Sequence, residues 1–208
     1  MVQYFIDGGG FMWPILISLV FGLGFAFERA YSLLMSSIDS DKFFTDVSEA
    51  LEVKGVDAAL ELCNDTKGPV AEIFHAGLSK THRGVSEVEK AINNAGSLEM
   101  AFLEKNMIWL NTVITVAPMI GFTGTVVGMI AAFDAIKAAN DISPAVVAGG
   151  ISQALLTTAF GLITAMIIQF FQNFFVSRID KLILDMEECS MKLVDQLYEI
   201  EDSNGRKK

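Results

Sequence analysis

Three long stretches of this chain contain no charged residue, and the rest of the chain carries all of its Asp, Glu, Lys and Arg. The uncharged stretches are residues 8–27, 106–133 and 142–177, which contain 20, 28 and 36 residues. About 20 apolar residues that rise about 1.5 Å each are enough to cross a hydrocarbon core of about 30 Å. The pattern therefore predicts three transmembrane helices and an all-α integral membrane protein.

These spans divide the chain into seven segments. We expect transmembrane helices at 11–35, 106–135 and 144–177. The remaining segments are an N-terminal stretch, a large helical loop, a short loop and a C-terminal helix with its tail, at 1–10, 36–105, 136–143 and 178–208. No positive charge precedes the first span, so we expect a membrane anchor there and not a signal peptide.

The distribution of Lys and Arg predicts the orientation of the spans. None precedes the first span and only Lys137 lies between the second and the third, whereas the large loop carries seven and the C-terminal tail six. Glu28 and Arg29 close the first span and Arg178 follows the third, at the expected membrane interface. We therefore expect the N-terminus outside, and the large loop and the C-terminus in the cytoplasm.

The large loop reads as a series of helices. Glycine and proline punctuation separates helices predicted at 41–54, 56–64, 70–80 and 86–106. Ser86 and Glu89 have the spacing of a capping box. Only Gly96 interrupts the pattern after Ser86, so we expect one long helix that continues into the second span.

The third span is also expected to continue into the cytoplasm. Ser143 suits the N-cap of this helix and Pro144 its first position. Beyond Arg178 an amphipathic pattern extends to Glu201, with apolar residues at Ile179, Leu182, Ile183, Met186, Met191, Val194 and Leu197. Two spans are thus predicted to extend into a cytoplasmic helical bundle.

The third span has a polar side. At about 100° per residue, one half of its circumference collects small and polar residues: Gly150, Gln153, Thr157, Thr158, Gly161, Thr164, Gln169 and Gln172. The other half is apolar. Polar groups in hydrocarbon cost free energy unless they face protein or water. This side is therefore expected to face a protein interior or a wet lumen.

The second span has a side of small residues. Gly121, Gly124 and Gly128 share it with Thr125. Such a ridge allows another backbone to approach closely, and helix packing alone is a sufficient explanation for it. Thr125 has two open interpretations, since a buried threonine can serve function or simply bond the carbonyl four residues earlier.

Composition excludes several other classes of function. The net charge of −10 argues against nucleic acid as a partner, whereas the spans require membrane lipid. Cys63 and Cys189 are expected to be free thiols. His75 and His82 are seven residues apart without a third ligand, so no metal site and no cofactor are expected. No nucleophile–base pair or phosphate-binding loop is present, and we do not expect an enzyme.

Two motifs resemble the ExbB/TolQ/MotA family of ion-channel motor subunits. Residues 117–130 read APMIGFTGTVVGMI, which is similar to the family pattern APLLGLLGTVxGMI. Residues 150–162 read GISQALLTTAFGL, which is similar to GIxEALxxTAxGL. Glu28-Arg29 resembles the pair that closes the first span in this family. The three spans fit the ExbB-like branch better than the MotA-like branch, which usually has four.

The resemblance implies a homopentamer in the bacterial inner membrane, with a periplasmic N-terminus. It implies that the second and third spans surround a pore, in which single-span helices of an ExbD/TolR-like partner each present one Asp. Ion flow would then energise a TonB- or TolA-like protein. Thr125 and Thr158 match the family threonines that face the partner's Asp.

One residue departs from the family pattern, because Gln153 stands where the family has Glu. The transported ion then has two alternatives. A proton could be carried by the partner's Asp alone and relayed by the Thr125 and Thr158 hydroxyls. Alternatively, Na⁺ could be bound by oxygens of Thr123, Thr125, Thr157, Thr158 and Gln153, because hard cations prefer oxygen ligands. A non-conducting membrane scaffold is the alternative function.

Overall fold

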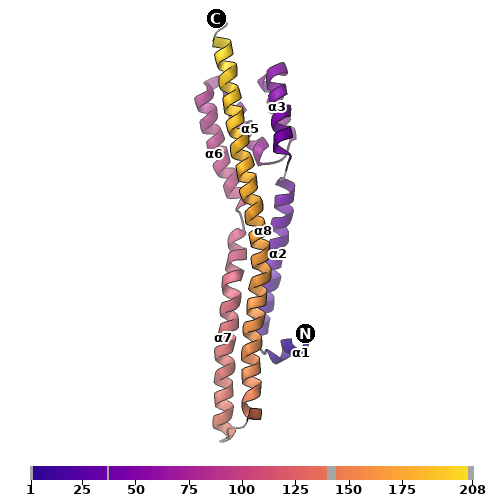
Figure 1. Ribbon diagram of the computed structural model, residues 1–208, viewed down its shortest axis with the longest axis vertical. Helices are drawn as coiled ribbons and strands as arrows, with labels where there is room; N and C mark the ends of the chain where they lie inside the picture. Colours follow the sequence, from indigo (N-terminus) through magenta and orange to yellow (C-terminus); the bar gives the residue numbers. More distant parts are fainter. Residues whose placement is uncertain (1, 37, 140–143, 206–208) are drawn as a thin grey trace. The chain divides into compact units, whose positions relative to one another are not determined.

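The computed structural model describes residues 2–36, 38–139 and 144–205, and all regular elements among them are helical (Figure 1). They are α1 (Val2–Asp7), α2 (Met12–Ser36), α3 (Ser40–Lys54), α4 (Val56–Asp65), α5 (Pro69–Leu78), the 3₁₀ turn η1 (Thr81–Arg83), α6 (Val85–Leu103), α7 (Met107–Ala139) and α8 (Pro144–Gly205).

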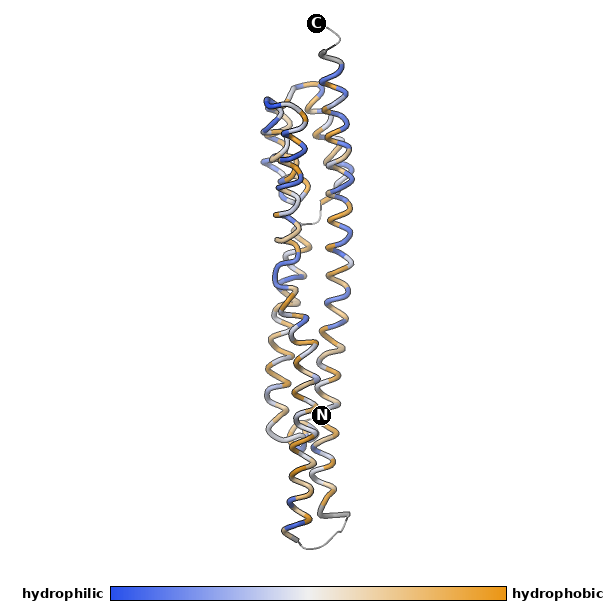
Figure 2. The backbone as a smooth tube through the Cα atoms, turned by 90° about the vertical axis from the view of Figure 1, so that its left-hand side faces the viewer, coloured by the Kyte–Doolittle hydropathy of each residue, from blue (hydrophilic) through white to orange (hydrophobic). Residues whose placement is uncertain are grey.

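Three helical stretches are long and apolar enough to cross a membrane, which confirms the predicted number of spans. They contain α2, α7 and the first half of α8. Pale and orange colours dominate these parts of the tube in Figure 2, where hydrophobic residues are orange. The fold is therefore that of an all-α integral membrane protein.

The chain forms two compact units. One combines residues 1–29 with 106–174, and the other combines 30–105 with 175–208. The first unit holds most of α2, all described residues of α7 and the first half of α8, and the second holds the end of α2, α3 to α6 and the later half of α8. We describe each unit separately.

In the first unit, α2 packs on both other spans. Gly22 makes this possible, because a β-carbon placed there would lie 2.8 Å from Ile168 Cδ1 of α8 and 3.2 Å from Val113 Cγ1 of α7. Trp109 of α7 stacks with Phe25, at a ring-centre distance of 6.0 Å. These contacts bury apolar side chains from all three helices, including Ile15, Ala26, Leu110, Val113 and Ile168.

The second unit is a small helical bundle. Consecutive pairs of helices from α3 to α6 pack on one another. Its core is apolar and includes Val47, Phe74, Leu78, Val88 and Leu193, all fully buried. Polar contacts at its surface join α3 to α8, since Gln196 Nε2 donates to Glu52 Oε1 at 3.0 Å and Lys192 lies 3.2 Å from Asp41.

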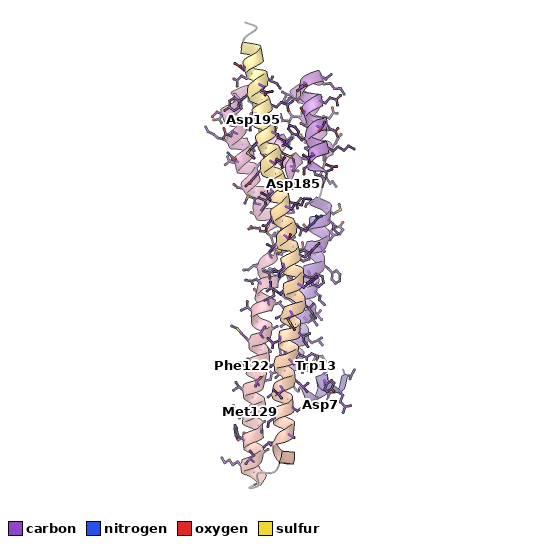
Figure 3. All side chains as sticks on the ribbon, viewed as in Figure 1. Asp7, Trp13, Phe122, Met129, Asp185 and Asp195 are labelled. Carbon is purple, nitrogen blue, oxygen red and sulfur yellow. The ribbon has the colours of Figure 1, made fainter. Side chains whose placement is uncertain are left out.

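The helix α8 is continuous to Gly205, as the amphipathic pattern beyond Arg178 predicted. Ile179, Leu182, Met186 and Leu197 are buried as expected. Met191 is not, because it is 62% exposed. Cys189 and Leu193 occupy the buried face instead, which explains the irregular spacing in the sequence pattern. The charged side chains labelled Asp185 and Asp195 in Figure 3 lie on this part of α8.

The prediction of one uninterrupted helix from Ser86 into the second span is wrong. The helix α6 ends at Leu103 and α7 begins at Met107. Asn106 has φ 66°, which is the left-handed region. Asn tolerates this conformation better than most residues, because its short polar side chain can bond locally. The apolar pattern alone did not reveal this interruption of the helix.

Two predicted helix starts also need comment. The capping box at Ser86 and Glu89 is wrong, because α6 begins at Val85 and its N-cap is Gly84, with φ 96° and no side-chain cap. Pro144 is the first residue of α8, as expected. The predicted N-cap Ser143, and the predicted loop from residue 140 onward, lie outside the described residues.

We expect both cysteines to react slowly with thiol reagents. Both are buried, and burial raises the pKa of Cys63 to about 12 and that of Cys189 to about 11. Only the thiolate reacts. Alkylation by iodoacetamide at pH 8 should therefore be slower by at least about 100-fold than in SDS-unfolded protein. Equal rates before and after unfolding would contradict the burial of these side chains.

Candidate functional site

The helices α7 and α8 run side by side and in opposite directions in the first unit (Figure 1). Their backbones touch through glycine. A β-carbon on Gly121 would lie 2.8 Å from the Thr157 carbonyl oxygen, and one on Gly161 would lie 2.7 Å from the Ala117 carbonyl oxygen. At the far end of the contact, a β-carbon on Gly150 would lie 2.6 Å from the Gly128 carbonyl oxygen. The ridge of small residues predicted on the second span is therefore a packing surface for α8.

Thr157 lies inside this contact. Its side chain has no exposed surface, and its Oγ1 is 2.6 Å from the position that a β-carbon on Gly124 would take. The hydroxyl donates within its own helix, 2.9 Å from the Ala154 carbonyl oxygen and 3.2 Å from that of Gln153. Thr157 thus serves to pack the two helices together.

Thr125 and Thr158 meet at the edge of the same contact. Their hydroxyls hydrogen-bond each other across the two helices, and both side chains are half-buried. Thr125 Oγ1 also lies 3.2 Å from both the Gly121 and the Ala154 carbonyl oxygens. Thr158 Oγ1 lies 3.3 Å from the Gly121 carbonyl oxygen. Two hydroxyls and two carbonyls therefore converge at one point.

The hydrogens of this cluster can be arranged in two ways. Each hydroxyl donates one proton and can accept two. If Thr158 donates to Thr125, then Thr125 donates to Gly121 or Ala154. If Thr125 donates to Thr158, then Thr158 donates to Gly121. In either order the hydroxyls keep acceptor capacity for a donor outside the chain. The pair can receive a hydrogen bond or relay a proton without ionising.

The structure does not bring Thr123 to this pair. Residues two positions apart in a helix differ by about 200° around its axis, which places Thr123 on another side of α7 from Thr125. Thr123 is exposed, and its hydroxyl donates to the Met119 carbonyl oxygen at 2.8 Å. Of the five predicted pathway residues, the structure joins Thr125 with Thr158 and places Thr157 beside them.

Gln153 faces a different part of the first unit. A β-carbon on Gly9 would lie 2.5 Å from Gln153 Nε2, so the amide packs against the glycine turn between α1 and α2. Gly9 itself has φ 69°. Five residues separate Gln153 from Thr158, which corresponds to about 140° around α8. Its side chain therefore belongs to the contact with α1 and α2.

The predicted membrane-interface residues Glu28 and Arg29 form a tight ion pair. Arg29 is only 2% exposed, and it donates two hydrogen bonds to the Glu28 carboxylate, at 2.7 and 2.6 Å. Asn106 Nδ2 donates to the same carboxylate at 3.3 Å. Sequence reasoning missed Asn106, although an Asn directly before an apolar run was a signal for a helix break. Arg178 is half-buried on α8, within the second unit.

The described residues contain no group of three His, Cys, Asp or Glu side chains that could hold a metal ion. His82 accepts a hydrogen bond from its neighbour Arg83 at 3.2 Å. Within the spans, the threonine pair joins hydroxyls from α7 and α8 at one point.

We expect Gly150→Ala and Gly149→Ala to differ in stability although the two residues are neighbours. The added methyl group at Gly150 meets the Gly128 backbone, whereas no atom lies within 4 Å of one at Gly149. Overpacking of this kind costs about 1–3 kcal/mol, or roughly 2–10 °C in melting temperature. Thermal unfolding of the purified proteins in detergent should therefore show a loss for Gly150→Ala, and no loss for Gly149→Ala. Equal melting temperatures would contradict close helix contact.

Comparison with known proteins agrees with the motifs. Residues 65–188 match the model of the MotA/TolQ/ExbB proton channel family. A biopolymer transport protein ExbB homologue of Methanothermobacter thermautotrophicus is 31% identical over 96% of this chain and 71% of its own length. An ExbB-like protein of Synechocystis is 27% identical over 82% of each chain.

Shorter stretches of this chain match proteins named TolQ and ExbB. The Tol-Pal system protein TolQ of Haemophilus influenzae is 42% identical over 36% of this chain and 33% of its own length. The ExbB protein of Xanthomonas campestris is 35% identical over 50% of this chain and 42% of its own length. With the family model covering more than half of the chain, a relative named as an ExbB homologue matching most of both chains, and three candidate spans in the fold, this protein belongs to the MotA/TolQ/ExbB proton channel family.

Proposed function

We propose that this protein is an ion-conducting motor subunit that couples the proton motive force to work outside the inner membrane. The observation that supports this function best is the Thr125–Thr158 pair. It places two hydroxyls and two carbonyls at the edge of an otherwise apolar helix contact, with acceptor capacity left over. A packing role alone does not require threonine on both helices at one point.

The proposed assembly is a homopentamer that surrounds single-span helices of an ExbD/TolR-like partner. The N-terminus lies in the periplasm, and residues 36–105 and 178–208 lie in the cytoplasm, as the Lys and Arg distribution predicts. A TonB- or TolA-like protein receives the mechanical output. The names of the relatives, which belong to biopolymer transport and to the Tol-Pal system, support these partners for the chain.

The proton step uses a carboxyl group of the partner. Its protonated form donates a hydrogen bond to the threonine hydroxyl that has a free lone pair. The carboxyl then gives its proton to water on one side of the membrane and becomes a charged carboxylate. Its position at the threonine pair becomes unfavourable, because an unpaired charge in an apolar surrounding is costly. Protonation from the other side restores the first state. One proton crosses for each cycle.

Sodium is the second candidate ion. Four oxygens from Thr125, Thr158, Gly121 and Ala154 lie close together, and Na⁺ prefers such hard ligands. The set is smaller than the one expected from sequence, because Thr123 and Gln153 face elsewhere and the Thr157 hydroxyl is used within α8. Both carbonyls also belong to helical backbone. These points favour the proton.

We expect Thr158→Val and Thr125→Val to lower ion flux at least tenfold in liposomes that contain the protein and its partner, because valine keeps the shape and removes the hydroxyl. Thr158→Ser should retain most of the flux. Thr112→Val is the matched control, since Thr112 is exposed on another side of α7 and donates to the Ile108 carbonyl oxygen at 2.8 Å. Wild-type flux in both valine variants, with assembly intact, would contradict an ion pathway through the threonine pair. A complex of the unsubstituted protein and its partner that conducts no ions would favour the non-conducting scaffold.

Replacement of Na⁺ by choline at fixed membrane potential and pH tests the ion. We expect flux to persist, because a carboxyl–hydroxyl relay carries protons and needs no metal ion. Flux that disappears with sodium and returns with its addition would instead assign Na⁺ to the oxygen cluster.

A further inference from the structure

Four polar side chains in the spans lie on the same side as the threonine pair but outside the packed surfaces. They are Asn111 and Thr115 of α7, and Gln169 and Asn173 of α8. Asn111, Thr115 and Asn173 are exposed and Gln169 is half-buried, whereas Leu110, Val113 and Ile168 beside them are buried. Exposed amides and hydroxyls at membrane depth are unfavourable against lipid. These side chains therefore need a polar surrounding.

Their positions match in pairs along the two helices. Thr115 lies ten residues before Thr125, and Gln169 lies eleven residues after Thr158, which is about 15 and about 16 Å along the axis. Asn111 and Asn173 are each about one turn further, at about 21 and about 22 Å. Because α7 and α8 are antiparallel, the members of each pair lie at the same depth, on the way to the Asn106 end of the spans.

Their directions also agree with that of the threonine pair. At about 100° per residue, Thr115 and Asn111 lie within about 80° of Thr125 around α7. Gln169 and Asn173 lie within about 60° of Thr158 around α8. The same calculation puts Thr112 about 140° from Thr125. A polar strip thus runs from the threonine pair along the seam between the two helices.

Proline supplies a backbone group in the gap between Thr125 and Thr115. Pro118 has no N–H, so it cannot donate to the Ile114 carbonyl within α7, and this oxygen keeps its acceptor capacity. Phe122, labelled on α7 in Figure 3, is 66% exposed in the same interval. The Ile114 carbonyl is therefore a backbone acceptor beside Thr115, at one end of this interval.

The amides hold one another at the far end of the strip. Gln169 Nε2 donates to Asn173 Oδ1 at 2.8 Å. Gln172 adds a buried amide oxygen that accepts no hydrogen bond from the described residues. Thr115 donates to the Asn111 carbonyl oxygen at 2.9 Å and keeps its lone pairs as acceptors. Such groups bind water, which needs two to four polar partners to be held in a protein interior.

We infer that Asn111, Thr115, Gln169 and Asn173 form the half-channel that connects the threonine pair to the Asn106 end of the spans. This inference rests on the proposed function and extends it to specific residues. The amides hold water along the strip. Protons then pass along this water, because each water molecule accepts one proton from its neighbour on one side and gives a different proton to its neighbour on the other. No residue of this chain changes its charge. For Na⁺ the same oxygens would act as ligands.

Ion flux in liposomes tests the inference. We expect Thr115→Val, Gln169→Leu and Asn173→Leu each to lower flux at least fivefold, and the double variant Thr115→Val/Asn173→Leu to lower it at least twentyfold, with the complex still assembled by size-exclusion chromatography. Thr112→Val is the control and should keep wild-type flux. Its hydroxyl lies near the depth of Thr115 and has the same bond to a carbonyl four residues earlier.

The two proposals fail in different ways. Loss of flux in Thr158→Val together with wild-type flux in the four strip variants would overturn the half-channel and leave the motor function standing. A complex of the unsubstituted protein and its partner that conducts no ions would remove the proposed function and the half-channel together. Wild-type flux in Thr158→Val and Thr125→Val would remove the threonine pathway and the half-channel that leads to it.

Thiol labelling gives a second measurement that does not depend on activity. Asn111→Cys and Thr115→Cys should react with a water-soluble, membrane-impermeant methanethiosulfonate at least tenfold faster than Thr112→Cys. The native Cys63 and Cys189 are buried, so the unsubstituted chain supplies the background rate. Equal reaction rates at all three positions would overturn the inference, because they would mean that water reaches Asn111 and Thr115 no better than Thr112.

Discussion

The close contact between the backbones of α7 and α8 determines the rest of the membrane unit. Two helices can approach this closely only where neither carries a β-carbon at the crossing points, and Gly121, Gly150 and Gly161 meet that condition. Lipid provides no hydrophobic driving force between helices, so van der Waals contact along this seam has to hold them together. The same short distance lets the short side chains of Thr125 and Thr158 form a hydrogen bond across the two helices. A looser contact would leave Thr125 and Thr158 bonded only to their own helices.

This arrangement separates the two tasks that a membrane ion pathway needs. The glycine and alanine side of the seam supplies rigidity, and the edge supplies oxygen atoms without charge. No residue in 106–133 or 142–177 is charged, so the seam itself carries no side chain whose ionisation would be penalised by burial. In the function that we propose, the ionisable group comes from a partner and moves relative to this surface. A neutral wall suits that task, since a fixed opposite charge would hold a carboxylate in one position.

Much of the fold could be predicted from the sequence, because hydropathy over about 20 residues determines a span and glycine spacing determines a packing surface. The polar side of the third span was also visible from helical periodicity. Angular position within a short motif was harder to judge. Thr123 and Thr125 look equivalent in sequence, yet they point to different sides of α7. The break at Asn106 depends on one backbone angle, and the burial of Cys189 in place of Met191 depends on packing within the second unit. The break leaves no trace in hydrophobic periodicity, and the packing around Cys189 appears there only as an irregular spacing.

Gln153 shows what a three-dimensional contact adds to a motif. By sequence it is the position where this chain departs from the family's Glu, and it invites the conclusion that an ionisable group has been lost from the pathway. Its amide instead packs against Gly9, at a turn whose left-handed backbone favours glycine, about 140° around α8 from Thr158. An ionised carboxylate in that contact would have to lose its hydration against backbone, which costs stability. A neutral amide avoids that cost. The Gln at this position is thus compatible with the ion conduction that we propose along the threonine edge, because its side chain belongs to the contact with α1 and α2 and not to that edge.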